Sequence, residues 1–205
     1  MPKLILQNPR APYAIPSEFR GWKWPGDTDE GRTARADWAK YFAYGCGEMD
    51  LADMPRSIAL QKVSNMKPMF LAGFWVVEEV VKEIMEGIDP ERHQFVPISL
   101  TTWMDRPLED GKWFMMNVYC HQSSIIDDMT NAKPVRGYEE TREKMLLNYL
   151  IPKITVDSAK LSQDIHFWRE DRYLDSLFMS DALYERLKAI GIVLPVHETG
   201  ILETS

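Results

Sequence analysis

The chain has 205 residues, of which 45% are hydrophobic and 27% are charged, and its formal net charge is −7 at pH 7. This length suits a folded domain with a sizeable core, and the composition excludes a disordered chain. The acidic balance argues against partners that are bound through their phosphates, so we expect no nucleic acid and, for any large partner, a basic protein.

The start of the chain and its cysteines indicate where the protein acts. The first residues, MPKLILQNPRAPYAIP, lack the apolar core and cleavage site of a signal peptide. The sequence contains no run of roughly eighteen apolar residues, so it predicts no membrane span. The two cysteines, Cys46 and Cys120, form neither a disulfide framework nor a zinc set. We therefore expect a reduced, cytoplasmic protein without membrane contact, metal or other cofactor.

Residues 1–56 are the least regular part of the sequence. Prolines interrupt residues 8–31 and exclude regular structure there. Large aromatic residues accompany these prolines, among them Trp22 and Trp24. A short helix is expected over residues 32–44. We predict that residues 1–56 pack as a proline- and aromatic-rich segment on an α+β domain formed by residues 57–205.

The first half of that domain alternates between strand and helix patterns. Ser57–Ser64 has the alternation of a strand. From Phe74 to near Gly87, apolar residues recur at helical spacing, which predicts an amphipathic helix. A strand with an edge-type proline, Pro97, follows over residues 94–100. Turn residues at 106–111 then lead into a returning strand over residues 112–120.

The second half contains two predicted helices. Residues 138–150 have acidic residues in their first turn, where the helix dipole favours them. Strand-like runs over residues 163–170 and 175–179 flank a charged turn from Arg169 to Arg172. Ser180 then has the position of an N-cap, and the helix it begins ends at Gly191. The serine is therefore interpreted as a cap rather than a nucleophile.

An internal echo links the two halves. Met69-Phe70-Leu71, a helix and Val96-Pro97-Ile98 resemble Leu177-Phe178-Met179, a helix and Leu194-Pro195-Val196. Such an echo would indicate a duplicated strand–helix–strand unit. Together the elements predict an α+β fold with a mixed or antiparallel sheet.

Catalytic patterns are weak throughout the chain. Cys120 and His121 are neighbours on a predicted strand, so their side chains point to opposite faces and cannot form a dyad there. Asp127 and Asp128 have the residue types of a metal or acid–base pair, although a solvated strand end explains them better. The sequence contains no nucleophile elbow, phosphate-binding loop or dinucleotide fingerprint.

Several stretches resemble a known family. They include DGKWFMMNVYCHQSSIIDD, Phe167-Trp168-Arg169, and Phe178-Met179-Ser180 with the helix that runs to Gly191. Together with the FVPI strand they are similar to immunity family eleven of the bacterial polymorphic-toxin systems, over roughly residues 57–196. The resemblance implies an antidote that binds the C-terminal domain of a cognate toxin and occludes its site, and it carries over no catalytic residues.

Two classes of function remain. The first is this toxin-neutralising protein, whose partner we expect to be basic and to act in the cytoplasm; the pattern also allows a homodimer. The second is a small hydrolase or transferase whose site assembles from distant residues. For the first class, aromatic anchors ringed by charged groups predict the binding surface. The candidate residues are Trp22, Trp24, Asp27, Asp29, Glu30, Asp105, Arg106, Glu109, Asp110, Asp127 and Asp128.

Overall fold

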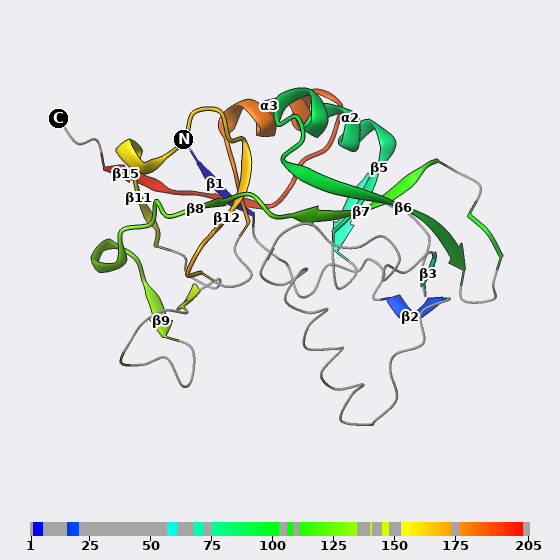
Figure 1. Ribbon diagram of the computed structural model, residues 1–205, viewed down its shortest axis with the longest axis horizontal. Helices are drawn as coiled ribbons and strands as arrows, with labels where there is room; N and C mark the ends of the chain where they lie inside the picture. The colour runs from blue at the N-terminus through cyan, green and yellow to red at the C-terminus, as the bar shows by residue number, and fades with distance from the viewer. Residues whose placement is uncertain are drawn as a thin grey trace. The chain divides into compact units, whose positions relative to one another are not determined.

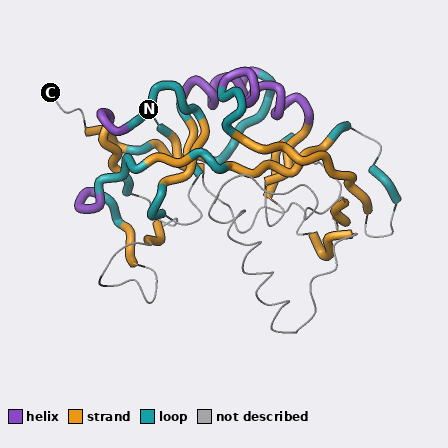
Figure 2. The backbone as a smooth tube through the Cα atoms, viewed as in Figure 1, coloured by secondary structure: helices purple, strands orange, loops and turns teal. Residues whose placement is uncertain are grey.

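The structure is a computed structural model, and the residues that it describes lie between 2 and 202. They are residues 2–5, 16–20, 57–60, 68–71, 75–102, 106–108, 111–134, 140, 145–147, 153–173 and 177–202. The chain divides into two compact units, Pro9–Tyr119 and Met1–Asn8 with Cys120–Ser205. Both units contain strands and a helix, so the predicted α+β class is confirmed (Figures 1 and 2).

The Pro9–Tyr119 unit is built on a six-stranded mixed sheet. Its order is β2 (Pro16–Arg20), β3 (Ser57–Leu60), β6 (His93–Thr102), β7 (Trp113–Val118), β5 (Trp75–Glu78) and β4 (Met69–Leu71). The alternation of β6 places Val96, Ile98 and Leu100 in the core. Phe70 and Trp113 meet edge to face there, with ring centroids 5.6 Å apart.

The predicted strands around Pro97 are confirmed, including the returning strand. β6 and β7 pair in antiparallel register from His93↔Val118 to Ile98↔Trp113. β3 pairs with β6 only from Ser99 to Thr102. Pro97 therefore lies beyond the β3 ladder, which explains how a proline without an N–H group fits an inner strand.

The helix predicted from Phe74 begins later than expected. Trp75–Glu78 is strand β5, which pairs with both β4 and β7, and α2 covers only Glu79–Ile88. Trp75, Val76 and Val77 are all buried, as expected for a strand that is covered on both faces. Apolar residues at helical spacing cannot be distinguished from such a strand by period alone. Tertiary pairing decides between them.

The second unit has a five-stranded sheet that includes the start of the chain. Its order is β14 (Val196–Glu198), β1 (Lys3–Ile5), β13 (Phe178–Met179), β12 (Phe167–Glu170) and β8 (His121–Gln122). Two small sheets pair β9 (Ala132–Pro134) with β10 (Met145–Leu147) and β11 (Thr155–Asp157) with β15 (Gly200–Leu202). Short 3₁₀ turns occupy Asp127–Met129 and Ser158–Lys160.

Strand β10 contradicts the helix predicted over residues 138–150. Met145, Leu146 and Leu147 pair with Pro134, Lys133 and Ala132. These three residues favour helices when they are free of tertiary contacts, but antiparallel pairing with the preceding strand β9 overrides that weak preference. Apart from Glu140, which lies in a turn, the remainder of the predicted helix falls outside the described residues.

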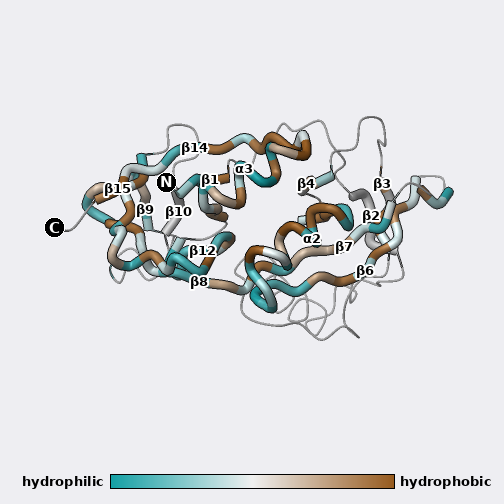
Figure 3. The backbone as a smooth tube through the Cα atoms, turned by 90° about the horizontal axis from the view of Figure 1, so that it is seen from above, coloured by the Kyte–Doolittle hydropathy of each residue, from teal (hydrophilic) through white to brown (hydrophobic). Residues whose placement is uncertain are grey.

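The C-terminal helix confirms the predicted cap and stop. α3 covers Asp181–Ala189, and the Ser180 hydroxyl accepts a hydrogen bond from the Leu183 N–H at 3.2 Å. Leu183 and Leu187 are buried. Gly191 has φ +82°, a left-handed conformation that ends many helices. Hydrophobic and hydrophilic residues alternate along α2 and α3 in Figure 3.

The internal echo exists at the level of topology. In one unit β5, α2 and β6 form a strand–helix–strand unit whose two parallel strands are separated by antiparallel β7. In the other, β13, α3 and β14 do the same, with β1 as the inserted strand. The strand directly before α2 is β5, Trp75–Glu78, rather than the predicted Met69–Leu71. Met69–Leu71 is β4, which pairs with β5 in antiparallel direction, and β12 pairs with β13 in the same way.

No helix in the described part of the chain combines the length and the apolar character that a membrane crossing requires.

Candidate functional site

The structure describes three of the predicted binding residues: Arg106, Asp127 and Asp128. Arg106 belongs to the Pro9–Tyr119 unit and the two aspartates to the other. The remaining predicted residues lie outside the described part of the chain. They are Trp22, Trp24, Asp27, Asp29, Glu30, Asp105, Glu109 and Asp110.

Arg106 lies at the return of the loop that joins β6 to β7. The Thr102 N–H donates to the Arg106 carbonyl at 2.8 Å, and the Arg106 N–H donates to the Thr102 hydroxyl at 3.2 Å. Gly111 ends the same connection with φ +93°, and a Cβ there would lie 3.0 Å from Glu78 Oε1. This geometry fixes the base of the turn and leaves Arg106 exposed.

Asp127 is held by internal contacts. Its Oδ1 accepts hydrogen bonds from Arg172 Nη2 at 2.7 Å and from the Tyr173 hydroxyl at 2.5 Å. Burial raises the pKa of Tyr173, and the hydrogen bond to the Asp127 carboxylate raises it further. Asp127 therefore anchors the segment after β12 to a 3₁₀ turn. Its neighbour Asp128 is exposed to solvent.

Glu170 organises the same region from inside the protein. Its side chain is buried, and its Oε2 accepts from the N–H groups of Ser124 at 2.8 Å and Ile125 at 3.2 Å. Its Oε1 accepts from the Ser124 hydroxyl at 2.5 Å and from Trp168 Nε1 at 3.1 Å. Burial raises the pKa of Glu170, and these four hydrogen bonds oppose that rise.

The role of Glu170 corrects the predicted charged turn at residues 169–172. Arg169 and Glu170 belong to β12 and are buried, and the turn begins at Asp171. Glutamate is seldom buried without partners. Glu170 shares a short strand with Phe167 and Trp168, which is a sequence signal for a buried, hydrogen-bonded carboxylate, although its partners Ser124 and Ile125 lie far away in the chain.

The neighbouring surface carries the histidine that follows Cys120. His121 Nδ1 lies 3.1 Å from Asp171 Oδ1, and the Ser123 hydroxyl donates to Asp171 Oδ2. Cys120 is half-buried and forms no disulfide. Within the described residues, no three histidine, cysteine or carboxylate side chains are grouped as metal ligands.

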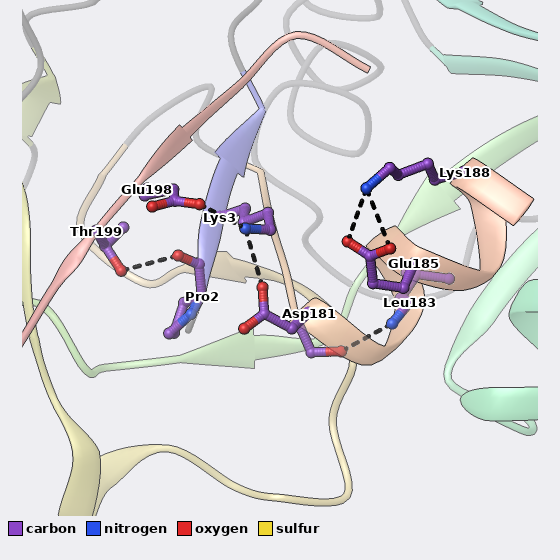
Figure 4. Close-up of polar contacts among 9 residues, drawn as sticks. Pro2, Lys3, Asp181, Leu183, Glu185, Lys188, Glu198 and Thr199 are labelled. Atoms are coloured by element: carbon purple, nitrogen blue, oxygen red, sulfur yellow. Dashed lines mark hydrogen bonds and ion pairs between the residues drawn. The ribbon is translucent and has the colours of Figure 1, made fainter. Parts of the chain in front are cut away.

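The start of the chain is tied to α3 and β14 by Lys3 (Figure 4). Its ammonium lies 2.9 Å from Asp181 Oδ1 and 3.0 Å from Glu198 Oε1, and 5.1 Å above the Tyr184 ring. The hydrogen bond to Asp181 raises the pKa of Lys3. The Thr199 hydroxyl adds a bond to the Pro2 carbonyl at 2.9 Å. These contacts hold β1 between β13 and β14.

The cap of α3 has a second polar neighbour. His166 Nδ1 lies 2.8 Å from the Ser180 hydroxyl that also caps the helix. Since that hydroxyl has one hydrogen to donate and two lone pairs, both contacts can be satisfied together. The pair fixes the His166 ring beside the first turn of α3. The local sequence pattern predicts the cap but not its histidine partner.

Comparison with known proteins gives one family. The model of an immunity protein family, Imm11, matches residues 27–201. The match reaches from the segment before β3 to strand β15 and includes helices α2 and α3. Among curated proteins, none matches the chain.

Proposed function

Because the chain belongs to the Imm11 immunity protein family, we propose that it binds a cognate antibacterial toxin domain and neutralises it. The observation that carries this proposal is the family match over residues 27–201. Neutralisation is proposed to occur by occlusion: the bound protein covers the site of the toxin and performs no chemistry of its own. The cytoplasm is the proposed place of action.

The charge of the chain supports a basic partner. With a formal net charge of −7, the protein attracts a positively charged domain over distances of about a Debye length, about 8 Å at physiological salt. Such attraction increases the rate of encounter more than it increases final affinity. We propose that the acidic residues predicted from the sequence contribute to it, with Asp128 as the exposed member of the described Asp127-Asp128 pair.

Occlusion rather than catalysis is consistent with how charged groups are used in the described residues. Asp127 and Glu170 hold strands and turns together through several hydrogen bonds each. Asp171 orients His121 and Ser123 on the surface. These contacts give Asp127, Glu170 and Asp171 structural roles.

Co-expression tests the proposal directly. The chain is produced in bacteria together with the C-terminal domain of the toxin encoded next to it, and growth and co-purification are measured. We expect restored growth and a complex that survives size-exclusion chromatography. A toxin domain made inactive by substitution is the control, because complex formation should then persist without any growth defect. Continued toxicity without a complex would refute the proposal.

A further inference from the structure

Helix α2 presents a second row of residues to solvent, beside the row that it buries. Val81 and Met85 are buried, and the helix packs on β5 and β7. Val80, Ile84 and Gly87 follow one another at spacings of four and three residues, so they lie on one stripe of the helix. Val80 is 37% exposed, Ile84 is partly exposed and Gly87 is exposed. We call these three residues the outer row of α2, and the function proposed above assigns no role to it.

Helix α3 shows how a helix of this protein looks when its solvent side is polar. It buries Leu183 and Leu187, as α2 buries its own pair. Its exposed positions carry only charged residues or alanine, namely Ala182, Glu185, Arg186, Lys188 and Ala189. On α2, hydrophobic stretches recur along the whole helix (Figure 3). The apolar surface of α2 is therefore wider than that of α3, and part of it remains in contact with solvent.

Glycine is an unfavourable residue at position 87. After proline it is the residue least suited to the interior of a helix. Among the described glycines, the left-handed conformation that favours this residue occurs at Gly111 and Gly191. A Cβ at Gly87 would meet no atom of the described chain within 4 Å, and the C-cap of the helix is Asp89. The described fold therefore gives no reason for a glycine here, whereas close approach by the backbone of a partner does.

Glutamates flank the outer row along its length. Glu79, Glu83 and Glu86 repeat the same spacing one position earlier in the chain. Lysine ammonium groups lie 2.8 Å from Glu79 Oε1 and 2.5 Å from Glu86 Oε2. Glu83, the middle member, is exposed and forms no ion pair or hydrogen bond within the described part of the chain. One uncompensated carboxylate therefore borders the centre of the outer row.

Charge and shape decide which partner suits this surface. Two copies of the chain would each bring a net charge of −7 and a glutamate row, so like charges oppose self-association through this face. Sites for small molecules are concave, whereas the outer row lies on the outer surface of a helix. A basic protein surface with an apolar centre matches both the outer row and its acidic border.

We propose that the outer row of α2, together with Glu83, is part of the surface that binds the toxin domain and receives an apolar patch bordered by a basic residue. The inference rests on the proposed function and deepens it, because it names a surface and the chemistry of its partner. Gly87 lets the toxin backbone approach the helix, and Val80 and Ile84 supply apolar contact. The Glu83 carboxylate pairs with the basic residue.

A side chain at position 87 tests the close approach. Gly87→Gln adds a good helix former in open space, so the protein should be at least as stable as wild type. Ala189→Gln is the matched control, because Ala189 is exposed at the end of α3. Affinity for an inactivated toxin domain, encoded next to the chain, is measured by titration calorimetry, with melting temperature in parallel. We expect Gly87→Gln to bind roughly tenfold more weakly without a lower melting temperature, and the control to bind within about twofold of wild type.

Charge reversal tests the basic residue of the partner. Glu83→Lys and Glu185→Lys change the net charge of the chain equally, and both glutamates are exposed on helices. The first lies beside the outer row, and the second lies on α3. We expect toxin association by Glu83→Lys to be at least about fivefold slower than by Glu185→Lys at low salt, with a smaller ratio at high salt. Equal rates would overturn the assignment of a basic residue.

The outcomes separate this inference from the proposed function. If wild type binds the toxin domain and Gly87→Gln binds within about twofold of it, the outer row is not part of the interface and the proposed function stands. If wild type does not bind, both proposals fail. If wild type self-associates in size-exclusion chromatography and Gly87→Gln is monomeric with unchanged toxin binding, a second copy covers the outer row and its assignment to the toxin is wrong. Should Gly87→Gln not fold, Val80→Gln tests the same row, because Val80 is exposed as well.

Discussion

Glu170→Ala removes the carboxylate that joins β12 to the segment at Ser124 and Ile125. Four donors lose their acceptor: two backbone N–H groups, the Ser124 hydroxyl and Trp168 Nε1. A buried donor left without a partner costs about 1–3 kcal/mol. The hydroxyl can rotate to another acceptor, and removal of the charge also removes a desolvation cost, so the losses do not simply add. We expect the free energy of unfolding to fall by about 3–5 kcal/mol.

Glu170→Gln separates the shape of the side chain from its charge. The amide oxygen can still accept the two backbone N–H groups, and Ser124 can rotate its hydroxyl to accept from the NH₂ group. Trp168 Nε1 then faces a donor, so one buried group is orphaned and the expected loss is about 1–3 kcal/mol. Glu185→Gln is the control, because its partner Lys188 lies on the exposed surface of α3 and such pairs contribute little.

The raised pKa of Glu170 adds a pH dependence to this comparison. Its pKa in the folded state lies above the ordinary value of 4.5. Between the unfolded and folded pKa values the folded state holds more protons, so stability from this group falls as the pH rises. The stability contributed by Glu170 is fully present below about pH 4.5 and is lost as the pH rises through the pKa of the folded state. The stability advantage of wild type over Glu170→Gln should therefore shrink as the pH rises above 4.5.

Urea denaturation followed by tryptophan fluorescence measures all three variants at several pH values. The expected order of stability is wild type and Glu185→Gln, then Glu170→Gln, then Glu170→Ala. If Glu170→Ala unfolds within 0.5 kcal/mol of wild type, a margin typical of neutral surface changes, the carboxylate does not organise this unit.

Three further predictions concern the helix, the interface and the thiol. Leu187→Ala, a buried residue of α3, should cost about 2–5 kcal/mol, whereas Ser180→Ala should cost about 1 kcal/mol as a lost cap; equal losses in denaturation curves would contradict this packing. A second variant changes three predicted interface residues to lysine: Asp27, Asp29 and Glu30. This triple charge reversal should slow toxin association most at low salt while stability changes by less than about 1 kcal/mol, and full inhibition at low salt would exclude these residues from the interface. Cys120→Ala should retain full protection in a growth assay and His121→Ala likewise, since neither is proposed to be catalytic; a folded Cys120→Ala variant that fails to protect would favour the enzyme alternative.

Local patterns predicted those elements whose stabilising contacts lie close together in the chain. The Ser180 cap reaches Leu183, three residues away, and Leu183 and Leu187 share one face of α3 because they are one turn apart. In such cases the residues that form the element also contain its start and stop signals.

The different roles of two predicted interface residues, Asp127 and Asp128, depend on tertiary contacts that a sequence pattern does not contain. Asp127 and Asp128 are adjacent in the sequence and equally acidic. In the folded chain, Asp127 binds Arg172 and Tyr173, whereas Asp128 is exposed. The sequence identified the pair, and only the fold distinguished its members.

By itself, the sequence determined the α+β class, the family resemblance and the C-terminal helix with both of its ends. The tertiary structure decided whether Trp75–Glu78 and Met145–Leu147 were strands, which partners Glu170 bound, and where β1 was inserted. The physical reason is the separation of the partners along the chain. Glu170 and Ser124 are 46 residues apart, and Lys3 and Glu198 are 195 residues apart. A period or a cap is expressed within a few residues, whereas strand pairing and the satisfaction of a buried charge depend on groups that meet only when the chain folds.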